Sequence, residues 1–211
     1  MGNKREPFLP DNVYHIYNHS IGSANLFLEE ANYYYFLDLF KKHISPFTEV
    51  YAYCLLPNHF HFILKIASFD EIMKFIHQKE YHFSGNRYFN ISEQISHLFG
   101  NCFNAYAKGI NKRYHRMGSL FVTSIKRKIV SDKNYLKQLI LYVNLNAVHH
   151  GFANNLEDWP YSSYRHIIHS NSFLVSCHKT IAFFNSKVQF RILHEEAFDK
   201  IKKAGETGPF F

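Results

Sequence analysis

The sequence has 211 residues, of which 46% are hydrophobic and 19% are charged, so we expect a folded chain with a sizeable core. Its formal net charge of +7 favours a polyanionic partner. It has no run of about 18 apolar residues and no apolar signal core near its start, which excludes a membrane-spanning helix. We therefore expect nucleic acid rather than a membrane as the partner, and the cytoplasm as the compartment.

The first part of the chain has the pattern of one strand, one helix and one hairpin. Val13–His19 alternates apolar and polar residues, which predicts a strand. Phe27–Ile44 has apolar residues at helical spacing and ends in cations, which suit a helix C-terminus. Glu49–Leu56 and His59–Ile66 read as two strands, and the Pro57-Asn58 turn between them predicts a hairpin.

The second part of the chain is predicted to be mainly helical. Phe69–His77 reads as a helix that is followed by a polar, aromatic loop, and Ser92–Asn111 as a second helix. Leu120–Val130 is expected to form a fourth strand. Ser131 is a plausible N-cap for a helix that runs to about Val148, and residues 171–211 read as a short α-helical tail.

This order of elements predicts the fold class. Strand, helix, strand, strand, helix, strand, helix is typical of an α+β, ferredoxin-like antiparallel sheet with helices on one face. The other face of such a sheet would stay open for a ligand. We expect one domain in residues 1–168 and a helical C-terminal extension in residues 169–211.

The strand His59–Ile66 carries the first candidate functional residues. Residues two apart on a strand project from the same face, so His59 and His61 point the same way while Phe60 points to the opposite face. Two imidazoles so placed can bind one metal ion. The alternative, two histidines on a half-exposed strand face, stays open, because a single His-X-His is expected by chance in a sequence with 15 histidines.

The helix after Ser131 has two faces of different character. Its apolar stripe, predicted to be core, consists of Leu136, Leu139, Ile140 and Val143. A neighbouring face consists of Tyr135, Gln138, Tyr142, Asn146 and His149. If this face meets the histidine strand, Asn146 can add an oxygen ligand while Tyr142 reaches a metal-bound phosphate. The alternative is that Tyr142 simply packs at the boundary of the core.

Basic residues cluster near the middle of the sequence. Our candidates for DNA contacts are Lys108, Lys112, Arg113, Arg116, Lys126 and Lys128. On a strand, Lys126 and Lys128 share one face while the intervening arginine points to the other. Lysine and arginine neutralise phosphates, and the nearby rings of Tyr106 and Tyr114 can stack on unpaired bases. The alternative is a solvated basic face without a ligand.

Three motifs together resemble a known family. The segments LPNHFHFILK, YVNLNAVHHGF and WPYSSYR occur in this order, and they resemble the REP-associated tyrosine transposases. These proteins belong to the single-tyrosine branch of the HUH (His-hydrophobe-His) nucleases. The resemblance covers roughly residues 10–168. In the last motif we expect Trp159 and Tyr161 to pack the C-terminal segment against the sheet.

The resemblance implies a function and a role for each matching residue. His59 and His61 match the metal-binding pair, Tyr142 the nucleophile, and Asn146 the third metal ligand. The implied enzyme uses Mg²⁺ or Mn²⁺ to cleave single-stranded DNA beside a hairpin, through a 5′-phosphotyrosine intermediate, and then transfers the strand in transposition or repeat mobilisation. The family pattern Asn-Pro is replaced here by Asn146-Ala147, which leaves both functional side chains in place. Relatives act as monomers or as homodimers.

A second class of function is compatible with the same pattern. A ferredoxin-like sheet with exposed aromatic side chains also resembles the RRM-like modules, which bind single-stranded nucleic acid without catalysis. In such a module the histidines would be inert and binding would be indifferent to a metal chelator.

Overall fold

The computed structural model describes residues 6–79, 90–122 and 125–204. Within these ranges the chain forms a four-stranded antiparallel sheet in the order β2-β3-β1-β4. The strands are β1 (Val13–His19), β2 (Thr48–Leu56), β3 (His59–Ile66) and β4 (Lys126–Val130). The predicted hairpin of β2 and β3 is confirmed, and the β-strand bounds of β1 and β3 are those expected from the sequence.

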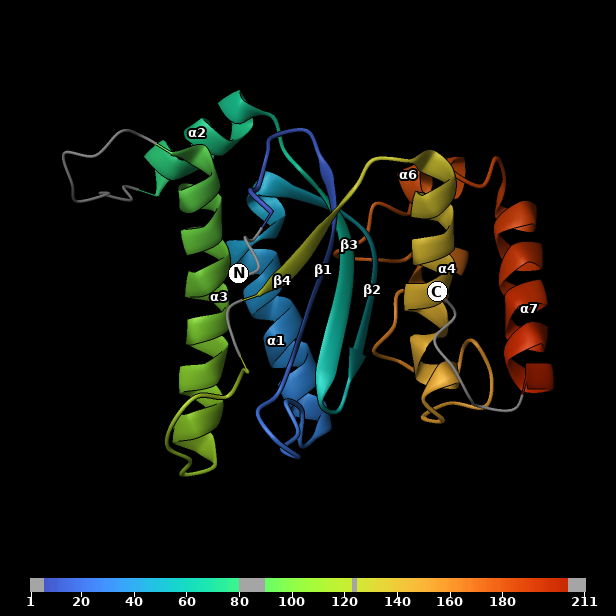
Figure 1. The fold of residues 1–211 in the computed structure, drawn as a ribbon, viewed down its shortest axis with the longest axis horizontal. Coiled ribbons are helices and arrows are strands. Elements are labelled where there is room, and N and C mark those ends of the chain that lie inside the picture. Colours follow the sequence, from blue (N-terminus) through green and yellow to red (C-terminus); the bar gives the residue numbers. More distant parts are fainter. Residues whose placement is uncertain (1–5, 80–89, 123–124, 205–211) are drawn as a thin grey trace, which may run out of the picture.

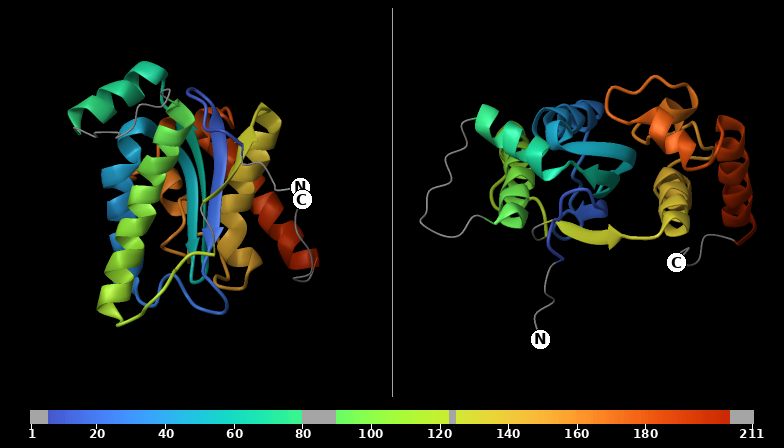
Figure 2. Two further views of the ribbon diagram at one scale, coloured as in Figure 1. Left: turned by 60° about the vertical axis from the view of Figure 1, so that its left-hand side comes forward. Right: turned by 90° about the horizontal axis from the view of Figure 1, so that it is seen from above.

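Helices make up most of the rest of the described chain. They are α1 (Glu30–His43), a 3₁₀ turn η1 (Ser45–Phe47), α2 (Phe69–Gln78), α3 (Ile91–Arg113), α4 (Lys133–His149), α5 (Tyr164–Ile168), α6 (Cys177–Ala182) and α7 (Lys187–Ala204). Figure 1 shows α1 and α3 on one side of the sheet and α4 and α7 on the other, and Figure 2 shows the same layers from two further directions. None of the helices in the described ranges is long and apolar enough to cross a membrane.

The predicted α+β fold with an antiparallel sheet is confirmed, but it differs in one detail. We expected helices on one face and an open face opposite, whereas helices cover both faces. The face that we expected to be open is covered by α4, which packs along β2 and β3. Its apolar stripe is buried throughout, since Leu136, Leu139, Ile140 and Val143 are each at most 5% exposed. A stripe of this kind has to be removed from water, and the histidine-bearing face of the sheet is where it is buried.

The face toward α1 and α3 holds an aromatic core. Phe60 and Phe62 of β3 point to this side, where the ring of Phe62 stacks on Phe40 at a centroid distance of 4.0 Å. Phe36 of α1 lies 5.2 Å from Phe60, and Phe103 of α3 lies 5.4 Å from it. Burying each phenylalanine stabilises the fold by about 1.5–3 kcal/mol. The alternation along β3 thus directs its aromatic side chains to this core and its histidines to the opposite face.

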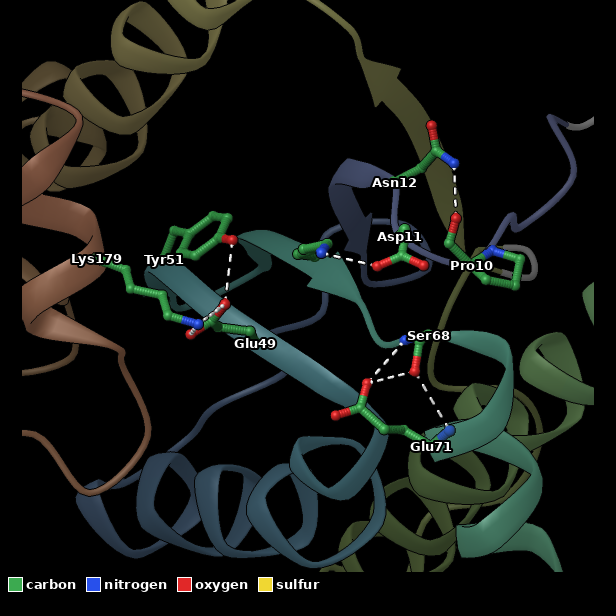
Figure 3. Close-up of polar contacts among 9 residues, drawn as sticks. Pro10, Asp11, Asn12, Glu49, Tyr51, Ser68, Glu71 and Lys179 are labelled. Atoms are coloured by element: carbon green, nitrogen blue, oxygen red, sulfur yellow. Dashed lines mark hydrogen bonds and ion pairs between the residues drawn. The ribbon is translucent and has the colours of Figure 1, made fainter.

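Residues after α4 tie the C-terminal part of the chain to the sheet. The indole Nε1 of Trp159 donates to the carbonyl oxygen of Leu55 at 2.8 Å, and the ring of Tyr161 stacks on Tyr33 at 3.7 Å. The expected packing role of Trp159 and Tyr161 is therefore confirmed. At the other end of β2, Glu49 pairs with Lys179 of α6 at 2.8 Å (Figure 3).

A buried hydrogen-bond chain joins α7 to α4 and to the sheet. His194 donates from Nδ1 to the carbonyl oxygen of Phe190 at 2.7 Å, which leaves its Nε2 to accept from the Asn144 amide at 3.0 Å. The Ser163 hydroxyl donates to Asn144 Oδ1 at 2.6 Å and accepts from the backbone of Tyr53 at 2.9 Å. The polar side chains of this chain are almost fully buried, so their mutual hydrogen bonds fix how α4 is rotated against the sheet.

Some boundaries differ from those predicted. The N-cap of α4 is Asp132 rather than Ser131, because the Asp132 carboxylate accepts from the backbone N–H of Tyr135 at 2.6 Å. The regular part of the fourth strand begins only at Lys126, although Phe121 forms an isolated bridge with Ser20. The α2 helix is confirmed and begins with a capping box of Ser68 and Glu71 (Figure 3). The aromatic loop predicted after it lies outside the described residues.

Candidate functional site

The histidine pair lies between the sheet and α4. His59 and His61 both point to the α4 side of β3, as the alternation predicted, and their rings are 5.2 Å apart at nearly a right angle. His61 is only 8% exposed. Burial lowers the pKa of His59 to about 4, with a smaller contribution from nearby His150, and it lowers the pKa of His61 well below its usual value. Both imidazoles are therefore neutral at pH 7, which is the form that binds metal ions.

Asn146 of α4 meets the first histidine. Its Oδ1 lies 3.2 Å from His59 Nε2, and the Asn146 side chain is fully buried. The other ring nitrogen of His59, Nδ1, lies 2.7 Å from Asn58 Oδ1 and donates to it. In this tautomer the Nε2 lone pair faces the Asn146 oxygen, so two acceptors converge, an arrangement that a cation between them would stabilise. The donor set therefore fits a divalent metal ion.

A third histidine, which sequence reasoning missed, supports the second one. His15 of β1 lies with its Nε2 2.9 Å from His61 Nδ1, and the two rings are stacked at 5.1 Å. Burial, aided by the charge of Lys128, lowers the pKa of His15 to about 4, so this ring is neutral and its Nε2 can accept a hydrogen bond from the Nδ1–H of His61. His61 then has its Nε2 left for a ligand. The alternation in Val13–His19 was the available signal, since it places His15 on one face of its strand.

Tyr142 lies beside this cluster on α4. Its ring meets His61 edge-on at a centroid distance of 5.6 Å and His15 at 6.4 Å. Burial raises the pKa of Tyr142, and a hydrogen bond from the Asn146 side chain partly offsets this by lowering it. The structure thus brings together all four residues singled out as the catalytic and metal-binding set. The phenol remains protonated at neutral pH and would have to lose its proton in order to act as a nucleophile.

The composition of the cluster limits how a metal can be held. Across residues 6–79, 90–122 and 125–204, no three side chains of His, Cys, Asp or Glu converge on one point. The ring centroids of His150 and His59 are 5.0 Å apart, but His150 completes no such group. A site of three protein ligands therefore needs the amide oxygen of Asn146 beside His59 and His61.

Comparisons with known proteins give the same family as the motifs. No family model matches the sequence. A Haemophilus influenzae protein, provisionally named a REP-associated tyrosine transposase, is 23% identical over 124 residues, which are 56% of this chain and 60% of the relative. Over this stretch the chain is similar in sequence to a protein named as a REP-associated tyrosine transposase, which agrees with the resemblance of the three motifs. The match spans less than two thirds of the relative's length, so it does not assign the activity of the whole relative to this chain.

A solved structure of a REP-associated tyrosine transposase has the same fold. It was determined with a bound REP hairpin, and it superposes on 84% of this chain and 90% of its own with a TM-score of 0.55. The sequence identity is 13%, so this likeness concerns the fold alone. This likeness confirms the predicted α+β architecture of the chain.

Two of the basic residues proposed from the sequence flank the candidate site. Lys126 and Lys128 of β4 pair with Tyr17 and His15 of β1, and they share the face that carries the histidines. The Lys126 ammonium lies 5.9 Å from the Tyr17 ring, and the Lys128 ammonium 5.6 Å from the ring of Tyr135 on α4. The predicted alternation is confirmed, because the intervening arginine points to the opposite face.

Of the other four basic residues, three lie near the C-terminal end of α3 and Arg116 follows that end, and α3 is on the opposite side of the sheet from α4 (Figure 1). Of these, Lys108, Lys112 and Arg113 are exposed and Arg116 is half-buried. Arg113 is paired with the Glu29 carboxylate at 2.5 Å. The six candidates therefore form two groups on different faces rather than one patch.

The aromatic side chains expected among these basic residues do not offer a stacking surface. Tyr106 is fully buried, and its hydroxyl donates to the carbonyl oxygen of Leu26 at 2.7 Å, so the expectation of an exposed ring is wrong. Tyr106 faces the core because α1 and α3 pack against each other along this side of the helix. Tyr114 is half-buried, and its hydroxyl donates to Glu29.

Proposed function

We propose that the chain is a metal-dependent endonuclease and strand transferase that acts on single-stranded DNA, with Tyr142 as the nucleophile. The observation that carries this proposal is the position of α4. On this helix Tyr142 lies against His61, and Asn146, one turn further on, lies 3.2 Å from His59. A nucleophile and three metal ligands thus share one site between the sheet and α4.

The proposed cleavage step exchanges one phosphoester bond for another. The Tyr142 oxygen bonds to the phosphorus as the bond from phosphorus to the 3′ oxygen breaks. The phenol proton is lost and the departing oxygen gains one, which leaves a 5′-phosphotyrosine and a free 3′-hydroxyl. Because one phosphoester is exchanged for another, the 3′-hydroxyl of a second strand can reverse the step and complete strand transfer.

His59, His61 and Asn146 would hold the metal, and His15 would keep His61 oriented through their 2.9 Å contact. A divalent cation bound there would neutralise the scissile phosphate and stabilise the departing oxygen. Mg²⁺ and Mn²⁺ are the expected ions, and two imidazole ligands favour Mn²⁺.

DNA that contains a hairpin is the proposed substrate. The solved transposase structure with the same fold has a REP hairpin bound, and this chain carries the positive charge that such a ligand requires. Lys126 and Lys128 lie on the face of the candidate site, where they can neutralise phosphates that flank the cleavage point. A monomer or a homodimer, and a cytoplasmic location, are parts of the same proposal.

The direct test is a covalent adduct. Labelled single-stranded DNA with a hairpin is mixed with the protein and Mn²⁺ and separated on a denaturing gel. We expect a shifted band that disappears in Tyr142→Phe and in EDTA, and that persists in Tyr135→Phe, a tyrosine two turns earlier on the same helix. An adduct that survives Tyr142→Phe would show that Tyr142 is not the nucleophile.

The non-catalytic, RRM-like alternative has no structural observation in its favour. Such modules bind through an open face of the sheet, whereas here α4 packs along β2 and β3 on the face of the histidines. In the same assay the alternative predicts no adduct and DNA binding that EDTA leaves unchanged.

A further inference from the structure

A small cavity adjoins Tyr142 on the side of α7. Its volume is about 190 Å³, and it is bounded by α4 and by α7 of the C-terminal extension. Leu141 and Leu145 of α4 and Ile201 of α7 form apolar walls. Gln138 and Lys200 are polar groups at its border. Among the described residues that line it, none is acidic.

We propose that this cavity receives one unpaired nucleobase of the DNA strand, next to the phosphate that Tyr142 attacks. The inference rests on the proposed function and extends it to the C-terminal extension. Tyr142 is the link, because its ring meets His61 and also lines the cavity. A strand whose phosphate lies at the phenol therefore has its neighbouring base within reach of the cavity.

The chemistry of the cavity fits a base better than other ligands. It is smaller than the roughly 300–1000 Å³ of sites for larger organic molecules, so it suits a single planar ring and excludes a base pair. Aliphatic walls such as Leu141 and Ile201 can cover the faces of the ring. The Gln138 amide both donates and accepts, as the edge of a base requires. Lys200 supplies a positive charge for an adjacent phosphate.

The buried contacts of α7 explain why the cavity keeps its shape. His194 of α7 accepts from Asn144 of α4 at 3.0 Å, which fixes one helix against the other. Ile201 packs against Leu145 and Val148 in a small apolar cluster. The extension thereby becomes part of the DNA-binding surface, and it would set a base preference at the cleavage site.

The test uses DNA with single missing bases. Tyr142→Phe protein, which cannot cleave, is titrated into labelled hairpin oligonucleotides that lack the base at one position on either side of the scissile phosphate. At one position we expect a loss of affinity of about tenfold, measured by fluorescence anisotropy. Adding Ala197→Met, which fills the cavity from α7, should weaken binding of intact DNA by a similar factor and abolish the effect of the missing base.

Two further variants test whether a loss of DNA binding reflects a lost contact or a loss of folding. Lys200→Gln should weaken binding without a change in melting temperature, whereas Lys202→Gln, exposed on the same helix, should leave binding unchanged. If no missing base matters while the wild-type protein still forms its adduct, the cavity does not bind a base and the proposed function stands. If the wild-type protein forms no adduct, the proposed function fails, and the anisotropy series still decides whether a base enters the cavity.

Discussion

His15 Nε2 lies 2.9 Å from His61 Nδ1, so two buried imidazoles on adjacent strands are joined directly behind the candidate metal site. The contact leaves His61 one ring nitrogen for a ligand and holds the ring in a single orientation. Neighbours that orient metal ligands in this way typically contribute 10- to 100-fold to metal affinity.

The first prediction follows from this contact. His15→Ala should weaken Mn²⁺ binding by about 10- to 100-fold, measured by isothermal titration calorimetry without DNA. His15→Gln keeps an acceptor in place and should recover part of the affinity. Equal Mn²⁺ affinity in wild type and in His15→Ala would show that His15 does not orient a ligand.

The second prediction concerns the third ligand. Asn146→Ala should abolish measurable Mn²⁺ binding, because the described residues offer no other group of three ligands around His59 and His61. Asn146→Asp keeps an oxygen and adds a charge, so it should bind Mn²⁺ at least as tightly as wild type. His150→Ala serves as the matched control and should leave Mn²⁺ affinity unchanged, since the His150 ring lies 5.0 Å from that of His59 but belongs to no group of three ligands among the described residues. Retained binding in Asn146→Ala would contradict the assignment.

The third prediction concerns the buried link between α7 and α4. His194→Leu removes the acceptor of the Asn144 amide and leaves that donor buried without a partner, which should cost about 1–3 kcal/mol of unfolding free energy. Urea denaturation is the measurement. His178→Leu, at an exposed position of α6, should change stability little. A similar loss in both variants would mean that the link contributes nothing specific.

The fourth prediction is a pH dependence from the same residue. Burial lowers the pKa of His194 to about 3, against 6.5 for an unperturbed histidine. Between these values the unfolded chain binds a proton that the folded chain does not, so stability is fully present above pH 6.5 and falls as the pH is lowered toward 3. The slope of unfolding free energy against pH in this window should therefore be smaller in His194→Leu, by about 1.4 kcal/mol per pH unit. Identical slopes would mean that His194 is not buried as a neutral ring.

The fifth prediction concerns the lysines beside the site. Lys128→Gln should weaken DNA binding and reduce the slope of log affinity against log salt by about 0.7, the value for one contact to a single-strand phosphate. The control is Lys74→Gln, which removes the same charge from an exposed position on α2. It should leave the slope unchanged. An equal effect of both changes would indicate a general charge effect rather than a contact at the site.

Much of the site could be predicted because strand and helix periods are local properties. The alternation around Phe60 was enough to place His59 and His61 on one face, and the helical spacing was enough to place Tyr142 and Asn146 together. The role of His15 could not be predicted in this way. Its contact with His61 depends on the register between β1 and β3, and the two histidines are 46 positions apart in the sequence.

The less successful predictions share a physical reason. An amphipathic pattern says that one side of a helix is buried, but it does not say against which surface. For α4 that surface is the histidine face of the sheet, which we had expected to be open. For α3 the buried side includes Tyr106, whose hydroxyl finds a backbone acceptor within the core, so its polar group did not require exposure.

The two edges of the sheet are protected by different means. Along β2, Val175 and Ser162 form bridges with Val50 and Cys54, so later parts of the chain satisfy the backbone groups of that edge. The β4 edge carries lysines instead, and charged side chains on an edge strand discourage pairing with the strand of another molecule. Lys126 and Lys128 thus also act against aggregation, and replacing both with apolar residues would expose a strand edge to self-association.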